Sequence, residues 1–591
     1  MNIKITFITT IFFLFCISCK GVVSNENSLV IQIELVDNNL LHVSYLFPTL
    51  VDHDAVFLFP QTLEGTRNIV KTSRIYDFTV FCTDTILTFY PKDSIKITNR
   101  AFDKISYLVK LDSIDKRISY FLNTFATDDL LVINPVSFCG YIPNYKNLKH
   151  IVQISGVDDY VSENGGQTLI YSFSNYNNFI NSPFYYSQKF SQLDTVIENT
   201  KIVLNIKSEF RTVPLNDILQ ITAPVVQIAL AELKDIGITV PEYTINVIFN
   251  EIVNSRTGMG ALERRDQTLI VFYAEPYFYT EKDSLDFVFD LQRILLHEML
   301  HLFMPLSFKD SLLEPFNHND LVMSGHLWLY EGFITYKTYK LLAINNLISI
   351  RKFLDKVENM IFSYRGAEMS GMRVSLYKSS IEAYEKPQFH QFFYNRSAVL
   401  CFYADLWIAK KSDGTKNLWT ILSDIYQTTP VFHPDSLNQY LIQRTFPEFE
   451  DFLNTYIIGY RYLNHKLFEQ FGLLYSLVIP TSTDKYIPVH ISSFENGILN
   501  VVIREHGLPP SPNDISLALT KINDLPISTF SFNSIHGRPI PKDYISVEVL
   551  RNGVRKNESL KLFSMISPNR PTYPNIVIEN DIFLQYFNSK K

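Results

Sequence analysis

The sequence His297-Glu298-Met-Leu-His301 lies inside an apolar pattern of helical period that runs from Leu285 to Met304. Residues four apart on a helix lie one turn apart on the same face, so the two histidines can present their imidazoles to a single metal ion. Glu298 neighbours that face and can take a proton from a metal-bound water. The alternative is that both histidines pack in a core. The pattern predicts a helix that carries two ligands of a metal site.

A single carboxylate, Glu331, stands in a strongly apolar stretch between Leu327 and Tyr336. A buried lone glutamate is costly unless it is paired or bound to metal. Two histidines and one glutamate with an open fourth position form a known catalytic zinc arrangement. The alternative is that Glu331 pairs with a nearby Arg or Lys. We predict one zinc ion per chain, held by His297, His301 and Glu331.

The metzincin class of zinc sites takes its third ligand from the segment directly after the second histidine. It needs a glycine three residues and a histidine six residues after that histidine. Those positions hold Met304 and Ser307 in this chain. The third ligand is therefore expected to be the glutamate.

Glu331 follows His301 by 30 positions and lies in the sequence Trp-x-x-Glu-Gly-x-x-Thr-Tyr. This combination resembles the glycyl aminopeptidase family of gluzincins, whose members often end in a PDZ domain. Residues 260–264 are similar to the family's Gly-Gly-Leu-Glu-His, and residues 394–400 to its Tyr-x-Lys-Gly-Ala-Leu-Val. The resemblance covers most of the chain, and the two zinc helices are its tightest matches.

The resemblance implies roles for residues beyond the metal ligands. Glu263, with Gly260 and Ala261 on the same substrate-binding strand, would meet the free α-amino group of a peptide. Tyr394 would donate its hydroxyl to the oxyanion of the tetrahedral intermediate, a strong contribution where water is excluded. The alternatives are that Glu263 is a surface residue beside the two arginines that follow it, and that Tyr394 only packs.

Three positions depart from the family's pattern. Arg264 stands where the family has His, Arg396-Ser397 replaces its Lys-Gly pair, and Leu302-Phe-Met-Pro replaces its usual Trp-Asn pair. None of these changes removes a zinc ligand. They bear on substrate preference more than on hydrolysis itself.

The residue pattern divides the chain into regions of different character. From Ser28 to Ile154, short β-branched and aromatic stretches alternate with polar turns, which favours a β-sandwich. Ile218–Leu233 has the period of an amphipathic helix, and Thr244–Phe249 that of a strand. We predict a multidomain α+β chain with a signal peptide and lipobox over 1–19, an N-terminal β-sandwich domain over 20–200, a mostly helical, thermolysin-like gluzincin catalytic domain over 201–465, a PDZ-like β-rich domain over 466–575 and a tail over 576–591.

The PDZ-like domain is implied by resemblance. Residues 507–514, 522–524 and 549–553 resemble the Gly-Leu…Gly-Asp, Ile-Asn-Gly and Arg-x-Gly spacing of the family's PDZ domain. Asn513 stands where the family has the glycine of Gly-Asp, so a degenerate peptide groove is expected.

The first residues resemble an export signal. Lys4 supplies a positive charge, and the apolar run Ile5–Ile17 is too short to span a bilayer but suits the core of a signal peptide. Ser18-Cys19 resembles the lipobox of bacterial lipoproteins, although Cys16 and Ser18 differ from its usual residues. We predict export to the cell envelope, in the periplasm or at the outer membrane, with Cys19 acylated as a membrane anchor. The alternatives are an ordinary cleaved signal or an uncleaved tether.

Composition excludes some classes of partner and site. The net charge is −7, and no basic run is interleaved with aromatics, so nucleic acid is not an expected partner. Cys82, Cys139 and Cys401 share no metal-ligand spacing and are expected to be buried thiols, with a Cys82–Cys139 disulfide as an alternative. Three further histidines near the motifs share no ligand spacing either, namely His318, His326 and His390.

These observations predict zinc-dependent hydrolysis of peptides or proteins, with Glu298 as general base and Tyr394 stabilising the oxyanion. The resemblance favours an aminopeptidase. One alternative is an endopeptidase of the same fold, in which Glu263 has no amine to bind. Another is a non-catalytic surface protein that grips peptides through the PDZ-like module. A structural zinc in such a protein is usually closed by four protein ligands, and the sequence offers only three.

Overall fold

The computed structural model describes residues 27–588, except for 52–53, 64–65, 68–71, 113–119, 162–167, 209–214, 250–258, 273–280, 370, 479–484, 487–488, 496–497, 504–514, 523–524, 527–543, 552–553, 562, 565–572 and 580–581. The chain divides into two compact units, residues 1–188 with 318–321 and residues 189–317 with 322–591. The predicted signal peptide and Cys19 lie outside the described residues, as do most of the positions that resemble a PDZ domain.

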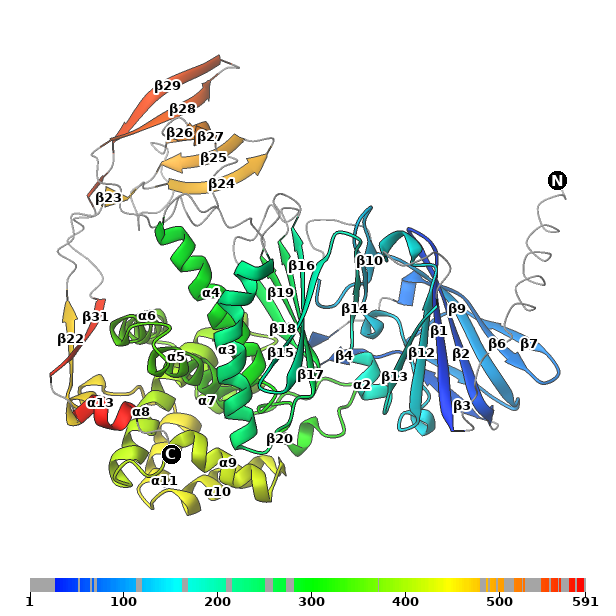
Figure 1. Cartoon of the computed structure of the whole chain (residues 1–591), viewed down its shortest axis with the longest axis horizontal. Coiled ribbons are helices and arrows are strands. Elements are labelled where there is room, and N and C mark those ends of the chain that lie inside the picture. Colours follow the sequence, from blue (N-terminus) through cyan, green and yellow to red (C-terminus); the bar gives the residue numbers. More distant parts are fainter. Residues whose placement is uncertain are drawn as a thin grey trace. The chain divides into compact units, whose positions relative to one another are not determined.

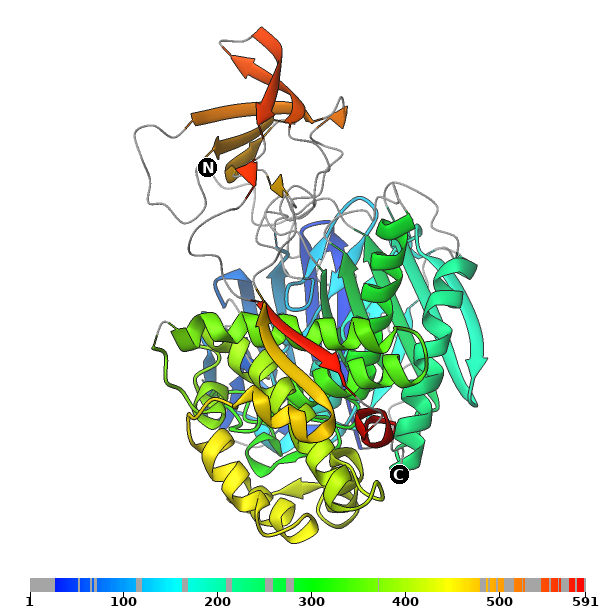
Figure 2. The same ribbon diagram turned by 90° about the vertical axis from the view of Figure 1, so that its left-hand side faces the viewer.

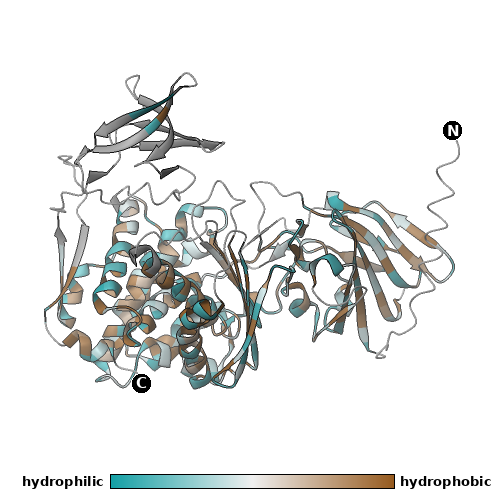
Figure 3. Ribbon diagram, turned by 45° about the horizontal axis from the view of Figure 1, so that its top comes forward, coloured by the Kyte–Doolittle hydropathy of each residue, from teal (hydrophilic) through white to brown (hydrophobic). Residues whose placement is uncertain are grey.

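The first unit is built on a seven-stranded sheet (Figure 1). Its two longest strands alternate buried and accessible residues over most of their length, as expected for a sheet with one face against a core. Figure 3 shows this alternation as brown and teal residues along the strands. The strand order is β13 (Leu169–Phe173), β12 (Lys149–Ser155), β1 (Ser28–Asp37), β2 (Leu40–Val51), β9 (Phe102–Lys110), β6 (Ile75–Cys82) and β7 (Ile86–Phe89).

Smaller sheets and aromatic side chains complete the first unit. Tyr45, Phe57, Phe78 and Tyr107 are fully buried and pack edge to face or stacked within its core. The smaller sheets are β3 (Ala55–Leu58) with β8 (Ser94–Ile97), and β10 (Phe125–Ala126), β11 (Leu131–Ile133) and β14 (Phe184–Tyr186). The predicted β-sheet region at the N-terminal end is therefore present.

The second unit begins with a five-stranded sheet whose last strand, β18, is antiparallel to its neighbour and forms one edge. Two long helices, α3 (Leu215–Asp235) and α4 (Glu281–Leu300), pack against each other beside this sheet (Figure 1). The strand order is β15 (Ser191–Ile197), β16 (Thr200–Ser208), β17 (Glu242–Phe249), β19 (Gln267–Phe272) and β18 (Met259–Glu263). Because β15 pairs with β16, the division between the units falls at Gln188 and Lys189 rather than near residue 200.

A helical region follows and shares one hydrophobic core with α3 and α4. Two of its elements, η7 and η9, are π-helical turns that contact each other and lead directly into α-helices. The elements are η7 (Trp328–Phe333), α5 (Ile334–Ile344), α6 (Ile350–Met369), α7 (Leu376–Ile381), η9 (Gln391–Arg396), α8 (Ser397–Lys411), α9 (Leu418–Thr428), α10 (Leu437–Arg444) and α11 (Phe449–Phe452).

The C-terminal part contains a six-stranded antiparallel sheet and then returns to the helical region. β22 (Leu473–Val478) and β31 (Tyr573–Ile578) run side by side, and Figure 2 shows this pair across the helices. The segment predicted as a tail contains α13 (Ile582–Phe587), which packs on α8 because Phe583 and Phe587 are fully buried. The sheet consists of β24 (Val489–Glu495), β25 (Ile498–Ile503), β26 (Ile515–Ile522), β27 (Leu525–Pro526), β28 (Tyr544–Arg551) and β29 (Val554–Lys561).

These observations confirm a multidomain α+β chain with N-terminal β-sheets and a central helical region. Cys82, Cys139 and Cys401 are free thiols, the last two of them buried, so no Cys82–Cys139 disulfide forms. None of the helices in the described part of the chain is long and apolar enough to cross a bilayer.

Candidate metal centre

Helix α4 positions both histidines of the predicted metal site. Leu291, Leu295 and Met299 are fully buried and fix the apolar face of the helix in the core. His297 and His301 lie one turn apart, and their Nε2 atoms are 3.1 Å from each other. The Nδ1 of His301 lies 2.7 Å from the Met304 carbonyl oxygen, which can only accept a hydrogen bond. In the neutral imidazole Nδ1 therefore carries the proton, and Nε2 has the lone pair that a metal ion would take.

The π-helical turn η7 brings Glu331 to the same point. Its Oε2 atom lies 3.3 Å from His297 Nε2 and 3.6 Å from His301 Nε2. This oxygen is buried and accepts no hydrogen bond from any described residue. Among the described residues Glu331 pairs with the two histidines and not with an arginine or lysine, as the alternative expected.

The three donor atoms fit a zinc ion. Zinc bonds of about 2.0–2.2 Å at tetrahedral angles place ligand atoms roughly 3.3–3.6 Å apart. The observed separations of 3.1, 3.3 and 3.6 Å agree with that spacing. The Glu331 oxygen is buried and receives no hydrogen bond from a described residue. A buried oxygen of this kind is expected where a metal ion is its partner.

Gly332 explains how η7 and η9 approach so closely. A Cβ atom on Gly332 would lie 1.8 Å from Ser397 Oγ and 2.8 Å from the Phe393 carbonyl oxygen. Ser397, one of the departures from the family's pattern, donates its hydroxyl to that same carbonyl. The glycine after the ligand Glu331 therefore lets the segment that carries Tyr394 pack directly on the segment that carries the ligand.

Tyr394 faces the metal donors from η9. Burial, and then the Glu331 carboxylate that its hydroxyl contacts, raise the pKa of Tyr394 well above its usual value. The hydroxyl is therefore a proton donor at neutral pH. Arg396 anchors the same turn, because its buried guanidinium donates to the carbonyls of Val374 and Arg461 at 2.9 and 2.8 Å. Arg396, which stands where the family has lysine, thus ties the turn to the segments of Val374 and Arg461.

Two further carboxylates meet at the site. Glu298 follows His297 on α4, and Glu263 ends the edge strand β18. Their oxygens and a His301 nitrogen lie within 4.8 Å of one another. Burial, and then Glu263, raise the pKa of Glu298 well above its usual value. The Glu263 carboxylate therefore lies at the centre rather than alone beside its arginines, and Arg264 donates to the Glu263 backbone carbonyl at 3.1 Å.

The charges around the histidines favour a cation. Burial alone would lower the pKa of His301, but the carboxylates of Glu331, Glu263 and Glu298 raise it to about 10. Three carboxylates thus surround two imidazoles, and the excess negative charge suits a divalent ion and a cationic substrate group.

A cleft of about 550 Å³ opens onto the metal centre. The predicted residues Ala261, His297, Glu298 and Tyr394 line it, whereas Gly260 lies one residue along β18 and is half-buried. The other lining residues were not predicted from the sequence, and four of them come from α6, at positions 356, 359, 360 and 363. That spacing places the residues on one helix face, but no motif marks them. The added residues are Arg293, Ile294, Thr335, Tyr339, Lys356, Asn359, Met360, Ser363 and Asn395.

The other three histidines have separate roles. The Nε2 of His318 lies 2.9 Å from Asn177 Oδ1 in the first unit, and the Nε2 of His326 lies 3.1 Å from the Pro434 carbonyl oxygen. The ring of His390 stacks on that of Tyr394, with centroids 5.9 Å apart. None of the three belongs to the clusters of metal-binding atoms found among the described residues.

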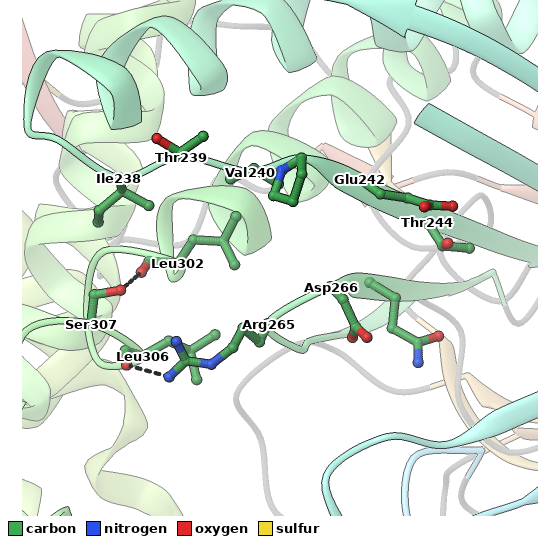
Figure 4. Close-up of a pocket in the computed structure, with 12 residues that line it drawn as sticks. Ile238, Thr239, Val240, Glu242, Thr244, Arg265, Asp266, Leu302, Leu306 and Ser307 are labelled. Carbon is green, nitrogen blue, oxygen red and sulfur yellow. Dashed lines mark hydrogen bonds between the residues drawn. The ribbon is translucent and has the colours of Figure 1, made fainter. Parts of the chain in front are cut away.

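A second cavity of about 570 Å³ is lined by residues of β17, the β18–β19 turn and the segment after His301 (Figure 4). Arg265 donates to the Leu306 carbonyl at 3.3 Å, and Ser307 donates to the Leu302 carbonyl at 2.7 Å. None of the candidate metal ligands lines this cavity. Its hydrogen bonds brace the turn that supplies the Met304 carbonyl to His301.

Comparison with known proteins bears on the fold and on the segment that carries the metal ligands. Residues 290–403 match the model of the M61 glycyl aminopeptidase family. An aminopeptidase N family protein from Idiomarina loihiensis has a similar fold, with a TM-score of 0.68 and 16% identity over 95% of this chain and 100% of that chain. An M1 zinc metallopeptidase from Deinococcus radiodurans aligns with a TM-score of 0.42 and 12% identity over 73% of this chain and 93% of that chain. No curated protein matches the sequence. The matched segment contains His297, His301 and Glu331 as well as Glu298 and Tyr394, whereas Glu263 lies before it.

Proposed function

We propose that this zinc metallopeptidase, whose metal-binding segment matches the M61 glycyl aminopeptidases, removes residues from the free amino end of peptides. The convergence of Glu263 with Glu298 and His301 carries the proposal. A carboxylate on an edge strand beside the metal ligands is placed to receive a protonated α-amino group. Binding that cation would also relieve the repulsion between Glu263 and Glu298.

The chemistry follows from the residues around the cleft. A zinc ion held by His297, His301 and Glu331 supplies Lewis-acid polarisation of a carbonyl and a lowered pKa for water. Glu298 accepts a proton from the attacking water while the water oxygen bonds to the scissile carbonyl carbon. Tyr394 donates its hydroxyl hydrogen to the developing oxyanion. When the C–N bond breaks, Glu298 returns the proton to the leaving amine and is ready for another cycle.

The proposal is tested with free and N-acetylated alanine and glycine tripeptides, with and without a chelator, beside Glu298→Gln. We expect hydrolysis of the free peptides only, loss of activity with chelator, and a drop in kcat of about 10³-fold or more in the variant. Equal cleavage of acetylated peptides would instead identify an endopeptidase. No cleavage by the zinc-loaded protein would favour a peptide-binding protein.

We propose further that the N-terminal β-sheets, up to Gln188, form a β-sandwich, that residues 466–575 form a PDZ-like module, and that Cys19 carries a lipid that anchors the protein in the cell envelope. The mostly antiparallel sheets of the first unit, in which only β1 and β12 pair in parallel among the described strands, support the first assignment, and the antiparallel sheet of residues 489–561 supports the second. The apolar run before Cys19 supports the third. Mass spectrometry of the purified full-length protein should find an acylated Cys19 at its N-terminus, and a shorter unmodified chain would refute the anchor.

A further inference from the structure

Two cations line the active-site cleft together with Glu298. Arg293 lies on α4 one turn before His297, and Lys356 lies on α6 across the cleft. Neither belongs to the metal site or to the residues implied by the resemblance. The cleft therefore contains both signs of charge, and Glu263 lies next to Glu298 in the carboxylate cluster.

Lys356 is held in place without an acidic partner of its own. Its ammonium lies 4.6 Å from the centre of the Phe289 ring, and no described acidic side chain comes within ion-pair distance of it. Asp290 is the carboxylate with the largest effect on the pKa of Lys356, and it lies 3.8 Å from the Arg293 guanidinium. Burial lowers the pKa of Lys356, and the charges of Lys352 and Arg293 add to that effect, whereas Asp290 and Asp286 oppose it. A half-buried ammonium of this kind gains from an anion supplied by a ligand.

The two ends of the cleft are separated by the length of a short peptide. Arg293 and His301 are eight positions apart, which corresponds to roughly 12 Å along the helix axis. Glu263 lies at the His301 end. An extended peptide spans at most about 3.3–3.6 Å per residue. A chain of about three residues therefore spans the length from the His301 end to Arg293, and Lys356 lines the same cleft.

We propose that Arg293 and Lys356 form a subsite for a carboxylate on the leaving-group side of the substrate, one or two residues beyond the scissile bond. The inference rests on the proposed function, since that function sets which end of the peptide meets Glu263. The carboxylate comes either from the C-terminus of a di- or tripeptide or from an acidic side chain. The preferred substrates are thus short or acidic peptides with a free amino end.

Binding by the zinc-loaded Glu298→Gln protein tests the subsite without relying on hydrolysis. Calorimetry would compare Ala-Ala-Ala, Ala-Ala-Ala amide, Ala-Asp-Ala amide and Ala-Ala-Asp amide. We expect the free acid, an acidic amide, or both, to bind about tenfold more tightly than the neutral amide. Tight binding of the free acid alone identifies the C-terminal carboxylate as the ligand, and tight binding of an acidic amide identifies the side chain.

Lys356→Met and Arg293→Gln should each reduce this preference to about twofold or less. Lys352→Met is the matched control, because Lys352 also stacks on Phe289, at 4.0 Å, but does not line the cleft. It should keep the full preference. Equal binding of all four peptides, a preference that survives both cleft variants, or an equal loss in the control would overturn the inference. Hydrolysis of Ala-Ala-Ala by the wild-type protein is scored separately, so failure of the peptidase function is distinguishable from failure of the subsite.

Discussion

Single residues at the metal centre have separable roles. Tyr394→Phe removes only the hydroxyl that faces Glu331 and the cleft. Loss of one oxyanion donor typically costs about 10²–10³-fold in kcat. We expect that loss with little change in KM and with unchanged zinc content, measured by steady-state kinetics and atomic absorption. Wild-type kcat in the variant would show that Tyr394 only packs.

Gly332 is predicted to be required for assembly of the ligand set. Gly332→Ala should lower stability by about 3 kcal/mol, since its Cβ meets both Ser397 and a backbone carbonyl, and should reduce bound zinc below one per chain. Adding Ser397→Gly removes the side-chain clash and should restore part of both properties. A Gly332→Ala protein with wild-type melting temperature and zinc content would contradict the packing described for η7 and η9.

At the residue scale, the sequence predicted ligands better than it predicted the cleft. The spacing of His297 and His301 and the isolated charge of Glu331 are local signals, so they can be found by inspection. Arg293 and Lys356 become neighbours only through the packing of α4 and α6. Nothing in the sequence near either residue marks the other.

Among the elements, α5 and α8 are joined by a buried ion pair. Lys340 donates to Asp405 at 2.8 Å, and the same carboxylate accepts hydrogen bonds from Tyr336 at 2.6 Å and from the Leu418 backbone at 2.7 Å. Asp405→Asn leaves the Lys340 ammonium buried without its counter-charge, which should lower stability by about 3–5 kcal/mol. Adding Lys340→Met should recover much of that loss in denaturant unfolding. A single variant as stable as the wild type would show that the pair contributes nothing.

Regular elements were predictable because their periods are simple. The helix expected over Ile218–Leu233 is α3, and the strand expected over Thr244–Phe249 is β17. The π-helical turns were not predictable, since their extra residue per turn comes from contacts between η7 and η9 rather than from local propensity. Those turns are the elements that place Glu331 and Tyr394.

The whole molecule should be sensitive to acid through buried neutral histidines. Burial lowers the pKa of His150 to about 4, although its contact with the Leu148 carbonyl opposes this, and burial lowers the pKa of His465 to about 4. Each takes up a proton near pH 6.5 when unfolded but only near pH 4 when folded. Their contribution to stability is therefore complete above about pH 6.5 and is lost as pH falls toward 4, by about 2 kcal/mol each at pH 5.

His150→Asn tests this expectation because asparagine can still donate to the Leu148 carbonyl, which lies 2.8 Å from Nδ1. Calorimetric melting temperatures at pH 7 and pH 5 would be compared for the variant and the wild type. The fall in melting temperature should be smaller in the variant. Equal falls in both proteins would refute the role of His150.

At the scale of the molecule, the sequence indicated an α+β chain with β-sheets before a helical metal-binding region, and that order is found. The return of the chain to the helical region through β31 and α13 was not predicted. Phe583 and Phe587 fall in the segment predicted as a tail, because nothing near them in the sequence marks the core in which they are buried.

We expect His297, His301 and Glu331 to bind a catalytic zinc ion in an open site. X-ray diffraction at the zinc absorption edge, from crystals of the zinc-loaded protein, tests it most directly. We predict one anomalous peak within about 2.0–2.2 Å of both Nε2 atoms and a Glu331 oxygen, with the fourth position facing the cleft. A peak elsewhere, or a fourth protein ligand that closes the site, would contradict the account.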